Sequence, residues 1–106
     1  MKITFLYYEA CPSHEVALAR LWAALAEVGV EADVEIIKVE TEAEAQRYQF
    51  VGSPTILING QDIVPPLAGA VPALTCRAYR LEDGRISPLP SLNMIRQALS
   101  RKMKDG

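Results

Sequence analysis

The sequence is poor in the residues that mark several specialised classes of protein. It contains 2 cysteines and 1 histidine. These are too few for a disulfide framework, and they are one ligand short of the four that a structural zinc site takes from a single chain. We therefore expect no structural zinc, no other resident metal and no cofactor.

A strong charge of one sign and a long hydrophobic run are also lacking. The 11 basic and 13 acidic residues give a net charge of -2, so neither nucleic acid nor an anionic membrane is expected as a partner. The uncharged stretches 48–61 and 63–76 are too short, and too interrupted by proline and glycine, to span a bilayer. The chain starts with a strand pattern and not with a basic segment followed by an apolar one, so we expect a cytoplasmic protein.

What the sequence does contain suits one globular domain over residues 1–106. Hydrophobic residues make up 50% and charged residues 23% of the chain, as in ordinary globular proteins. A chain of this length supports one hydrophobic core but not two.

The first half of the chain alternates between strand and helix patterns. Residues 2–8 are apolar on both faces, which is typical of a central strand in a covered sheet. A helical pattern runs from residue 12 to Gly29, and residues 32–39 form a second strand pattern. We therefore expect a right-handed crossover between two parallel strands. The expected apolar stripe of the helix consists of Leu18, Leu21, Trp22, Leu25 and Val28.

The middle of the chain predicts a short helix and a hairpin. Thr41 and Glu44 form a capping box at the start of the helix. Asn59-Gly60 indicates a tight turn between strands at 55–58 and 62–64, because such a turn needs two residues that tolerate positive φ.

The last third of the chain predicts a loop, then a strand or an extended segment, and then a helix. Residues 65–73 show no periodicity, and residues 74–80 fit either a strand or an extended segment. Asp83-Gly84 marks a turn, and Ser91 caps a helix over about 92–103. The expected buried side of this helix consists of Met94, Ile95, Ala98, Leu99 and Met103. The order of elements predicts an α/β fold with a mixed sheet of about four strands.

Cys11 lies between the first strand and the first helix. Proline is favoured at the first helical position, so Pro12 places Cys11 at the N-cap. There the amides of Ser13 and His14 and the helix dipole would stabilise a thiolate, and a protonated His14 would add to this effect. Cys11 would then be a reactive nucleophile. The alternative is a small buried residue that only packs, and Cys76 and His14 taken alone fit structural roles too.

Two motifs and the order of elements resemble those of the thioredoxin-like superfamily. Residues 11–14, Cys-Pro-Ser-His between a strand and a helix, occupy the position of its redox motif, and residues 53–55 match the cis-proline loop that faces that motif. More narrowly, the chain resembles small bacterial thioredoxin-fold proteins of the alkylmercury lyase-like type. The stretches that carry the resemblance are "YEACPS" (8–13), "RYQFVGSPT" (47–55), "PTILINGQDI" (54–63), "TCRAYR" (75–80) and "MIRQAL" (94–99).

The resemblance implies a thioredoxin-like fold with helices on both faces of the sheet. It also implies that Cys11 is the nucleophile, and that residues beside it and in the facing loop hold the substrate. Those substrate-binding residues are Pro12, Ser13, Ser53, Pro54 and Thr55. The bond between Ser53 and Pro54 is expected to be cis.

The sequence departs from the usual redox motif, because His14 stands where Cys-x-x-Cys has its second cysteine. Three kinds of chemistry remain open. Cys11 can form a mixed disulfide that an outside thiol resolves, or it can work with the distant Cys76. Alternatively, both thiolates can bind a soft metal such as mercury, with or without cleavage of an organomercurial. For such cleavage, only Glu9 or Asp62 is expected near enough to supply a proton.

These alternatives give three hypotheses about function. The first is a thiol–disulfide oxidoreductase that acts on a thiol or disulfide substrate, with Cys11, Cys76 and His14 as catalytic residues. The second is a protein that binds a soft metal or an organomercurial. The third is a non-catalytic interaction domain, because folds of this kind are often reused.

Cys76 is expected close to Cys11 although the two are far apart in the sequence. The strand that starts at Thr55 leaves the loop beside Cys11 and turns back at Asn59-Gly60. The return strand therefore ends near that loop, where the Pro65-Pro66 pair stops it, and the segment around Cys76 can begin there. The alternative is that Cys76 is buried elsewhere as a packing residue.

Overall fold

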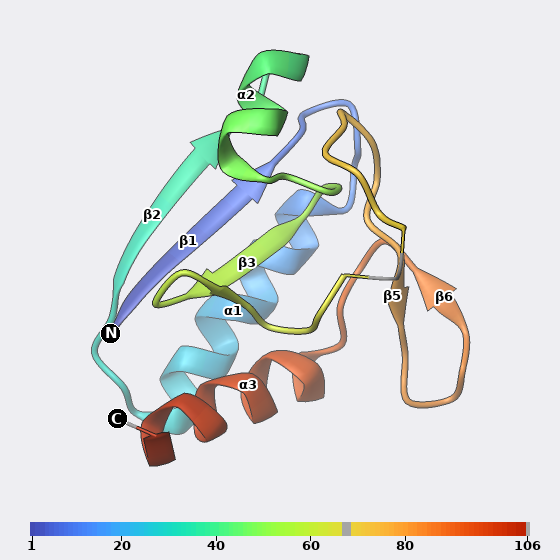
Figure 1. Ribbon diagram of the computed structural model, residues 1–106. Helices are drawn as coiled ribbons and strands as arrows, with labels where there is room; N and C mark the ends of the chain where they lie inside the picture. Colours follow the sequence, from blue (N-terminus) through green and yellow to red (C-terminus); the bar gives the residue numbers. More distant parts are fainter. Residues whose placement is uncertain (67–68, 106) are drawn as a thin grey trace.

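The fold places helices against a mixed sheet of four strands (Figure 1). The computed structural model describes residues 1–66 and 69–105, so Leu67 and Ala68 of the expected loop lie outside the described residues. In chain order, the elements are β1 (Lys2–Tyr7), α1 (His14–Val28), β2 (Asp33–Lys38), α2 (Glu42–Tyr48), β3 (Thr55–Ile58), β4 (Gln61–Asp62), β5 (Tyr79–Arg80), β6 (Ile86–Ser87) and α3 (Leu92–Asp105).

β1 lies in the middle of the sheet, whose strand order is β2-β1-β3-β4. It pairs in parallel with β2 and antiparallel with β3. β3 continues into β4 through Asn59 and Gly60, which both have positive φ. Side chains alternate along β1, so Ile3 and Phe5 face one side, Leu6 faces the other, and all three are buried. The predicted central strand, parallel pair and hairpin are confirmed.

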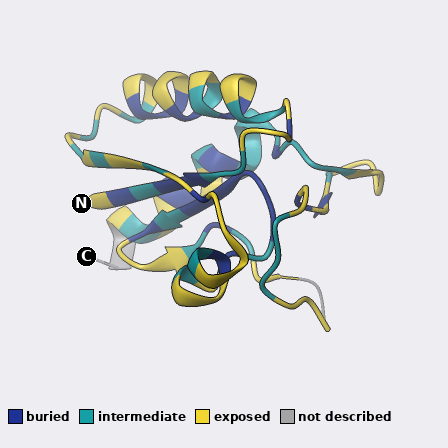
Figure 2. Cartoon of the chain, turned by 90° about the horizontal axis from the view of Figure 1, so that it is seen from above, coloured by how far each residue is buried: buried dark blue, intermediate teal, exposed yellow. Residues whose placement is uncertain are grey.

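Helices cover both faces of the sheet. α1 and α3 pack against each other and against the face that carries Ile3 and Phe5. α2 contributes Ala45 to a smaller cluster with Leu6 on the opposite face. Figure 2 shows the buried residues of the helices toward the sheet and their exposed residues outward. The buried residues of the main core are Ile3, Phe5, Ala17, Leu21, Ala24, Leu25, Ile56, Ile58, Ile63, Tyr79, Ile95, Ala98 and Leu99.

α1 starts later than its sequence pattern predicts. It begins at His14 with Ser13 as the N-cap, so the prediction that Cys11 caps a helix starting at Pro12 is wrong. The reason is a turn between β1 and α1, in which the N–H of Cys11 donates a 3.0 Å hydrogen bond to the carbonyl oxygen of Tyr8. This turn occupies the residues that would otherwise form the first helical turn.

The buried side of α1 also differs from the predicted stripe. Trp22, placed in that stripe by the sequence pattern, is 48% exposed. The buried residues of the helix are Ala17, Leu21, Ala24 and Leu25. Two of these four residues are alanines, so small side chains form much of the buried side of the helix. The large indole of Trp22 lies on the exposed side.

The predictions for the rest of the chain are largely confirmed. The Thr41 hydroxyl accepts a hydrogen bond from the amide of Glu44 at the start of α2. β4 is shorter than the expected strand over 62–64. β5 and β6 form a separate two-stranded sheet around the Asp83-Gly84 turn, a pairing that the sequence pattern does not predict.

α3 carries its buried residues in its first two and a half turns. Ile95, Ala98 and Leu99 are buried, whereas Met94 is half-buried. Met103 is 46% exposed, so its predicted burial is wrong, because it lies beyond Leu99, the last helical member of the main core. Within residues 1–66 and 69–105, no helix combines the length and the apolar character that crossing a membrane requires.

Candidate site at the Cys11–Cys76 disulfide

Cys11 and Cys76 form a disulfide that joins the turn after β1 to the segment before β5. Their Cα atoms are 5.7 Å apart, although 65 positions separate them in the sequence. The prediction that Cys76 lies close to Cys11 is confirmed, and the alternative of a distant packing residue is excluded. The sequence did not show whether the two cysteines form a disulfide.

The two cysteines differ in their access to solvent. Cys11 is 2% exposed, whereas Cys76 lies in an exposed position. A small pocket of about 90 Å³ lies beside Cys76, and its lining residues are Val51, Ala70, Cys76, Arg77 and Ala78. An outside thiol would therefore meet the disulfide from the side of Cys76.

His14 contacts the backbone of Cys11. Its Nδ1 lies 2.8 Å from the carbonyl oxygen of Cys11 and must carry the proton of this hydrogen bond, because a carbonyl oxygen only accepts. The imidazole also stacks on the ring of Tyr7, with the ring centroids 4.6 Å apart. These contacts hold the turn that carries Cys11 against the end of β1. The predicted catalytic role of His14 stays a prediction.

The loop at residues 53–55 faces the turn that carries Cys11. The bond between Ser53 and Pro54 is cis, as expected. The hydroxyl of Ser53 accepts a 2.9 Å hydrogen bond from the amide of Tyr8, and the hydroxyl of Thr55 donates to the carbonyl oxygen of Gly52. Ser53, Pro54 and Thr55 are all buried. The structure therefore brings the two sequence motifs together.

The backbone of Ser53 pairs with the segment around Cys76. Its N–H donates to the carbonyl oxygen of Thr75 at 2.8 Å, and its carbonyl oxygen accepts from the N–H of Arg77 at 2.9 Å. Cys76 thus forms an isolated parallel bridge with Ser53. In the disulfide state, a substrate can pair with the backbone of Ser53 only if this segment is displaced.

The other two expected substrate-binding residues lie nearer the surface. Pro12 is exposed and Ser13 is half-buried at the start of α1. Both follow Cys11 directly in the chain. Their contact with a substrate stays a prediction.

Gly52 allows the segment around Cys76 to approach the loop. A Cβ atom at Gly52 would lie 2.7 Å from the Cα of Arg77 and 2.9 Å from the carbonyl carbon of Cys76. Its φ of +145° is also one that side chains rarely adopt. Both observations show that only glycine suits this position.

Arg77, directly after Cys76, is a buried residue that the sequence analysis did not single out. It is 5% exposed, and its guanidinium forms a 2.9 Å ion pair with Asp62 at the end of β4. The same group donates to the hydroxyl of Thr55 and to the carbonyl oxygen of Val64. Alternation places Arg77 and Tyr79 on the same side of an extended segment, but this pattern does not indicate which residues that side meets.

Tyr79 completes this buried network. Its hydroxyl donates a 2.6 Å hydrogen bond to the carbonyl oxygen of Pro54, and the guanidinium of Arg77 lies 4.6 Å from the centre of its ring. Burial raises the pKa of Tyr79 above its ordinary value, so the hydroxyl keeps its proton. Burial also raises the pKa of Asp62, although the neighbouring Arg77 acts in the opposite direction.

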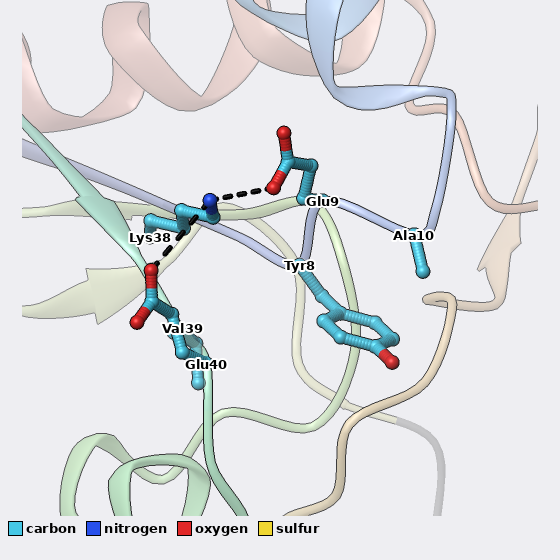
Figure 3. Close-up of a pocket in the computed structure, with 6 residues that line it drawn as sticks. All are labelled: Tyr8, Glu9, Ala10, Lys38, Val39 and Glu40. Atoms are coloured by element: carbon cyan, nitrogen blue, oxygen red, sulfur yellow. Dashed lines mark ion pairs between the residues drawn. The ribbon is translucent and has the colours of Figure 1, made fainter.

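A second pocket lies at the carboxyl ends of β1 and β2. It has a volume of about 460 Å³ and is lined by Tyr8, Glu9, Ala10, Lys38, Val39 and Glu40. Figure 3 shows Lys38 between the carboxylates of Glu9 and Glu40. The hydrogen bond from Lys38 lowers the pKa of Glu9, so this carboxylate is ionised near neutral pH and is a poor proton donor.

The arrangement suits chemistry at two sulfur atoms. Within residues 1–66 and 69–105, no group of three or more His, Cys, Asp and Glu side chains is placed to hold a metal ion. Reduction would replace this bond with two thiols. No family model, curated protein or solved structure matches the chain.

Proposed function

We propose that the protein is a thioredoxin-like thiol–disulfide oxidoreductase that uses Cys11 and Cys76 as its redox pair. The observation that carries this proposal is a disulfide with one buried and one exposed cysteine, at a junction between a strand and a helix. Structural disulfides and catalytic disulfides both cross-link a fold. An exposed cysteine beside a pocket favours the catalytic kind, because exchange requires a thiolate to reach it.

The proposed reaction has two exchange steps. In the reduced protein, the thiolate of Cys76 attacks one sulfur of a substrate disulfide, forms a mixed disulfide and releases the first substrate thiolate. The thiolate of Cys11 then attacks the sulfur of Cys76, releases the second substrate thiolate and closes the protein disulfide. The substrate gains two electrons and the cysteine pair loses two. Two molecules of an outside thiol such as glutathione restore the pair and leave as glutathione disulfide.

This order exchanges the roles that the sequence motif suggests. The resemblance to thioredoxins makes Cys11 the attacking residue, but Cys11 is buried and Cys76 is exposed. Access therefore favours Cys76 for the first attack and Cys11 for the second. His14 would hold the turn of Cys11 in place during the second step through its bond to the Cys11 carbonyl.

The experiment is turnover of a small disulfide, bis(2-hydroxyethyl) disulfide, with glutathione as reductant. We expect turnover by the wild-type chain and none by C76S. When C11S is treated with the disulfide in the absence of glutathione, it should stop at a mixed disulfide at Cys76, because the residue that resolves it is missing. Wild-type turnover no faster than that of the uncatalysed reaction, or full turnover by C76S, would refute the proposal.

The proximity of the two cysteines also supports a second function, the binding of a soft metal. Two thiolates whose Cα atoms lie 5.7 Å apart suit a soft cation such as mercury. Cleavage of a carbon–mercury bond has less support, because Glu9 and Asp62 are both engaged in ion pairs. Stoichiometric mercury binding by the reduced chain without disulfide turnover would favour this function. A chain with neither property would favour the non-catalytic interaction domain.

A further inference from the structure

We propose that Arg77 is a positioning residue, which with Asp62 holds Cys76 beside Cys11 when the disulfide is reduced. The inference deepens the proposed function and rests on it, because only the two cysteines of a redox pair must come together again in each cycle. The contacts that support it do not involve sulfur. They can therefore persist when the bond between the two cysteines is broken.

The side chain of Arg77 ties the segment around Cys76 to the main sheet. Its ion-pair partner Asp62 belongs to β4, where it is paired with Leu57 of β3. The bond from Arg77 to Thr55 reaches the beginning of β3. Because Arg77 is adjacent to Cys76 in the chain, a guanidinium fixed at these points limits how far the cysteine can move.

The backbone adds a second set of contacts on both sides of Cys76. The carbonyl of Thr75 and the N–H of Arg77 both pair with Ser53, in the loop that faces Cys11. The close approach at Gly52 permits this pairing. Side chain and backbone together place Cys76 next to Cys11 before any disulfide forms.

The effective concentration of the two thiols measures such placement. It is the equilibrium constant for oxidation of the two protein thiols by one glutathione disulfide, which gives the protein disulfide and two molecules of glutathione. A side chain that only stabilises the fold contributes equally to both redox states, so its effect cancels. A side chain that holds Cys76 affects the two states unequally. Without it, the reduced segment gains freedom of movement, whereas in the oxidised state the disulfide still holds the segment, so closing the disulfide costs more and the effective concentration falls.

The experiment is equilibration of the full chain with glutathione buffers, for wild type, R77Q and D62N. The matched control is R80Q, because Arg80 is an exposed arginine that lies shortly after Arg77 in the chain, in β5. We expect the effective concentration to fall about tenfold in R77Q and in D62N, equivalent to about 30 mV. We expect R80Q to agree with wild type. Circular dichroism of both redox states shows that each variant is folded.

One further variant keeps the experiment decisive. If R77Q does not fold, Y79F replaces it, because that change removes only the hydroxyl that bonds to Pro54 and neighbours Arg77, and a severalfold fall is expected. Folded variants with an unchanged effective concentration would overturn the role of Arg77. The measurement needs no substrate turnover, so a chain that equilibrates with glutathione but reduces no other disulfide would refute the proposed function alone.

Discussion

The amide of Arg77 donates a 2.9 Å hydrogen bond to the carbonyl oxygen of Ser53. Through this bond, the segment that contains Cys76 lies along the loop where the sequence motif predicts a substrate backbone. The oxidised chain thus pairs a peptide of its own with that loop and joins its cysteine to Cys11. The same geometry makes Cys76 the part of the pair that an outside molecule meets first.

The exposure of the two cysteines predicts different rates of alkylation in the reduced protein. We expect iodoacetamide to modify Cys76 several times faster than Cys11, because Cys11 is 2% exposed and Cys76 lies at the surface. The variants C11S and C76S each leave one thiol, so mass spectrometry can follow each rate separately. In denaturant the two rates should become similar. Equal rates in the native state would contradict the assignment of the first attack to Cys76.

Local patterns in the sequence were sufficient for most of the fold. The alternation of β1, the capping residue Thr41 and the Asn59-Gly60 turn each act within a few residues, so their signals can be seen without the structure. Cys76 could be placed near Cys11 because the hairpin returns the chain to its starting edge. The start of α1 could not be predicted, because it depends on the bond from Cys11 to Tyr8 that closes a turn.

The buried network beside Cys76 lay beyond the reach of sequence patterns. Arg77 and Asp62 are 15 positions apart and meet only because β4 and the segment before β5 lie side by side. Buried arginines are rare and require such partners. The exposure of Trp22 had a similar cause, since the packing of α1 against α3 and the sheet determines which side of the helix is buried.

The disulfide is expected to stabilise the fold. It closes a loop of 65 positions, for which the loop-entropy model gives about 4 kcal/mol. Urea unfolding of the oxidised and the reduced protein should therefore differ by about this free energy. The double variant C11S/C76S serves as the control and should unfold identically with and without reductant. If the wild-type protein also unfolds identically in both conditions, the disulfide does not restrict the unfolded chain as this model requires.

Gly52 should tolerate substitution far less well than Gly60. In G52A, the new Cβ would meet the backbone of Arg77 at 2.7 Å and would impose a rare φ, so we expect a loss of about 3 kcal/mol or more. In G60A, the Cβ meets nothing within 4 Å, and only the positive φ opposes it, at a cost of about 1 kcal/mol. Urea unfolding measures both changes. Similar losses in the two variants would contradict the close approach at Gly52.

The Asp62 carboxyl predicts a dependence of stability on pH. Burial raises its pKa in the folded protein, whereas in the unfolded chain the pKa is about 3.9. Between these two values the folded state binds more protons than the unfolded state, so stability falls as pH rises. The contribution is fully present below about pH 3.9 and is lost as pH rises through the folded pKa.

The variant D62N isolates this contribution, because asparagine keeps the shape and cannot ionise. The free energy of unfolding of the wild type minus that of D62N should decline as pH rises from about 3.9, and level off above the folded pKa. Both proteins are kept oxidised while urea unfolding is measured at successive pH values. If the difference grew with pH instead, the attraction of Arg77 would outweigh the cost of burial, and Asp62 would be more acidic in the fold than in the unfolded chain.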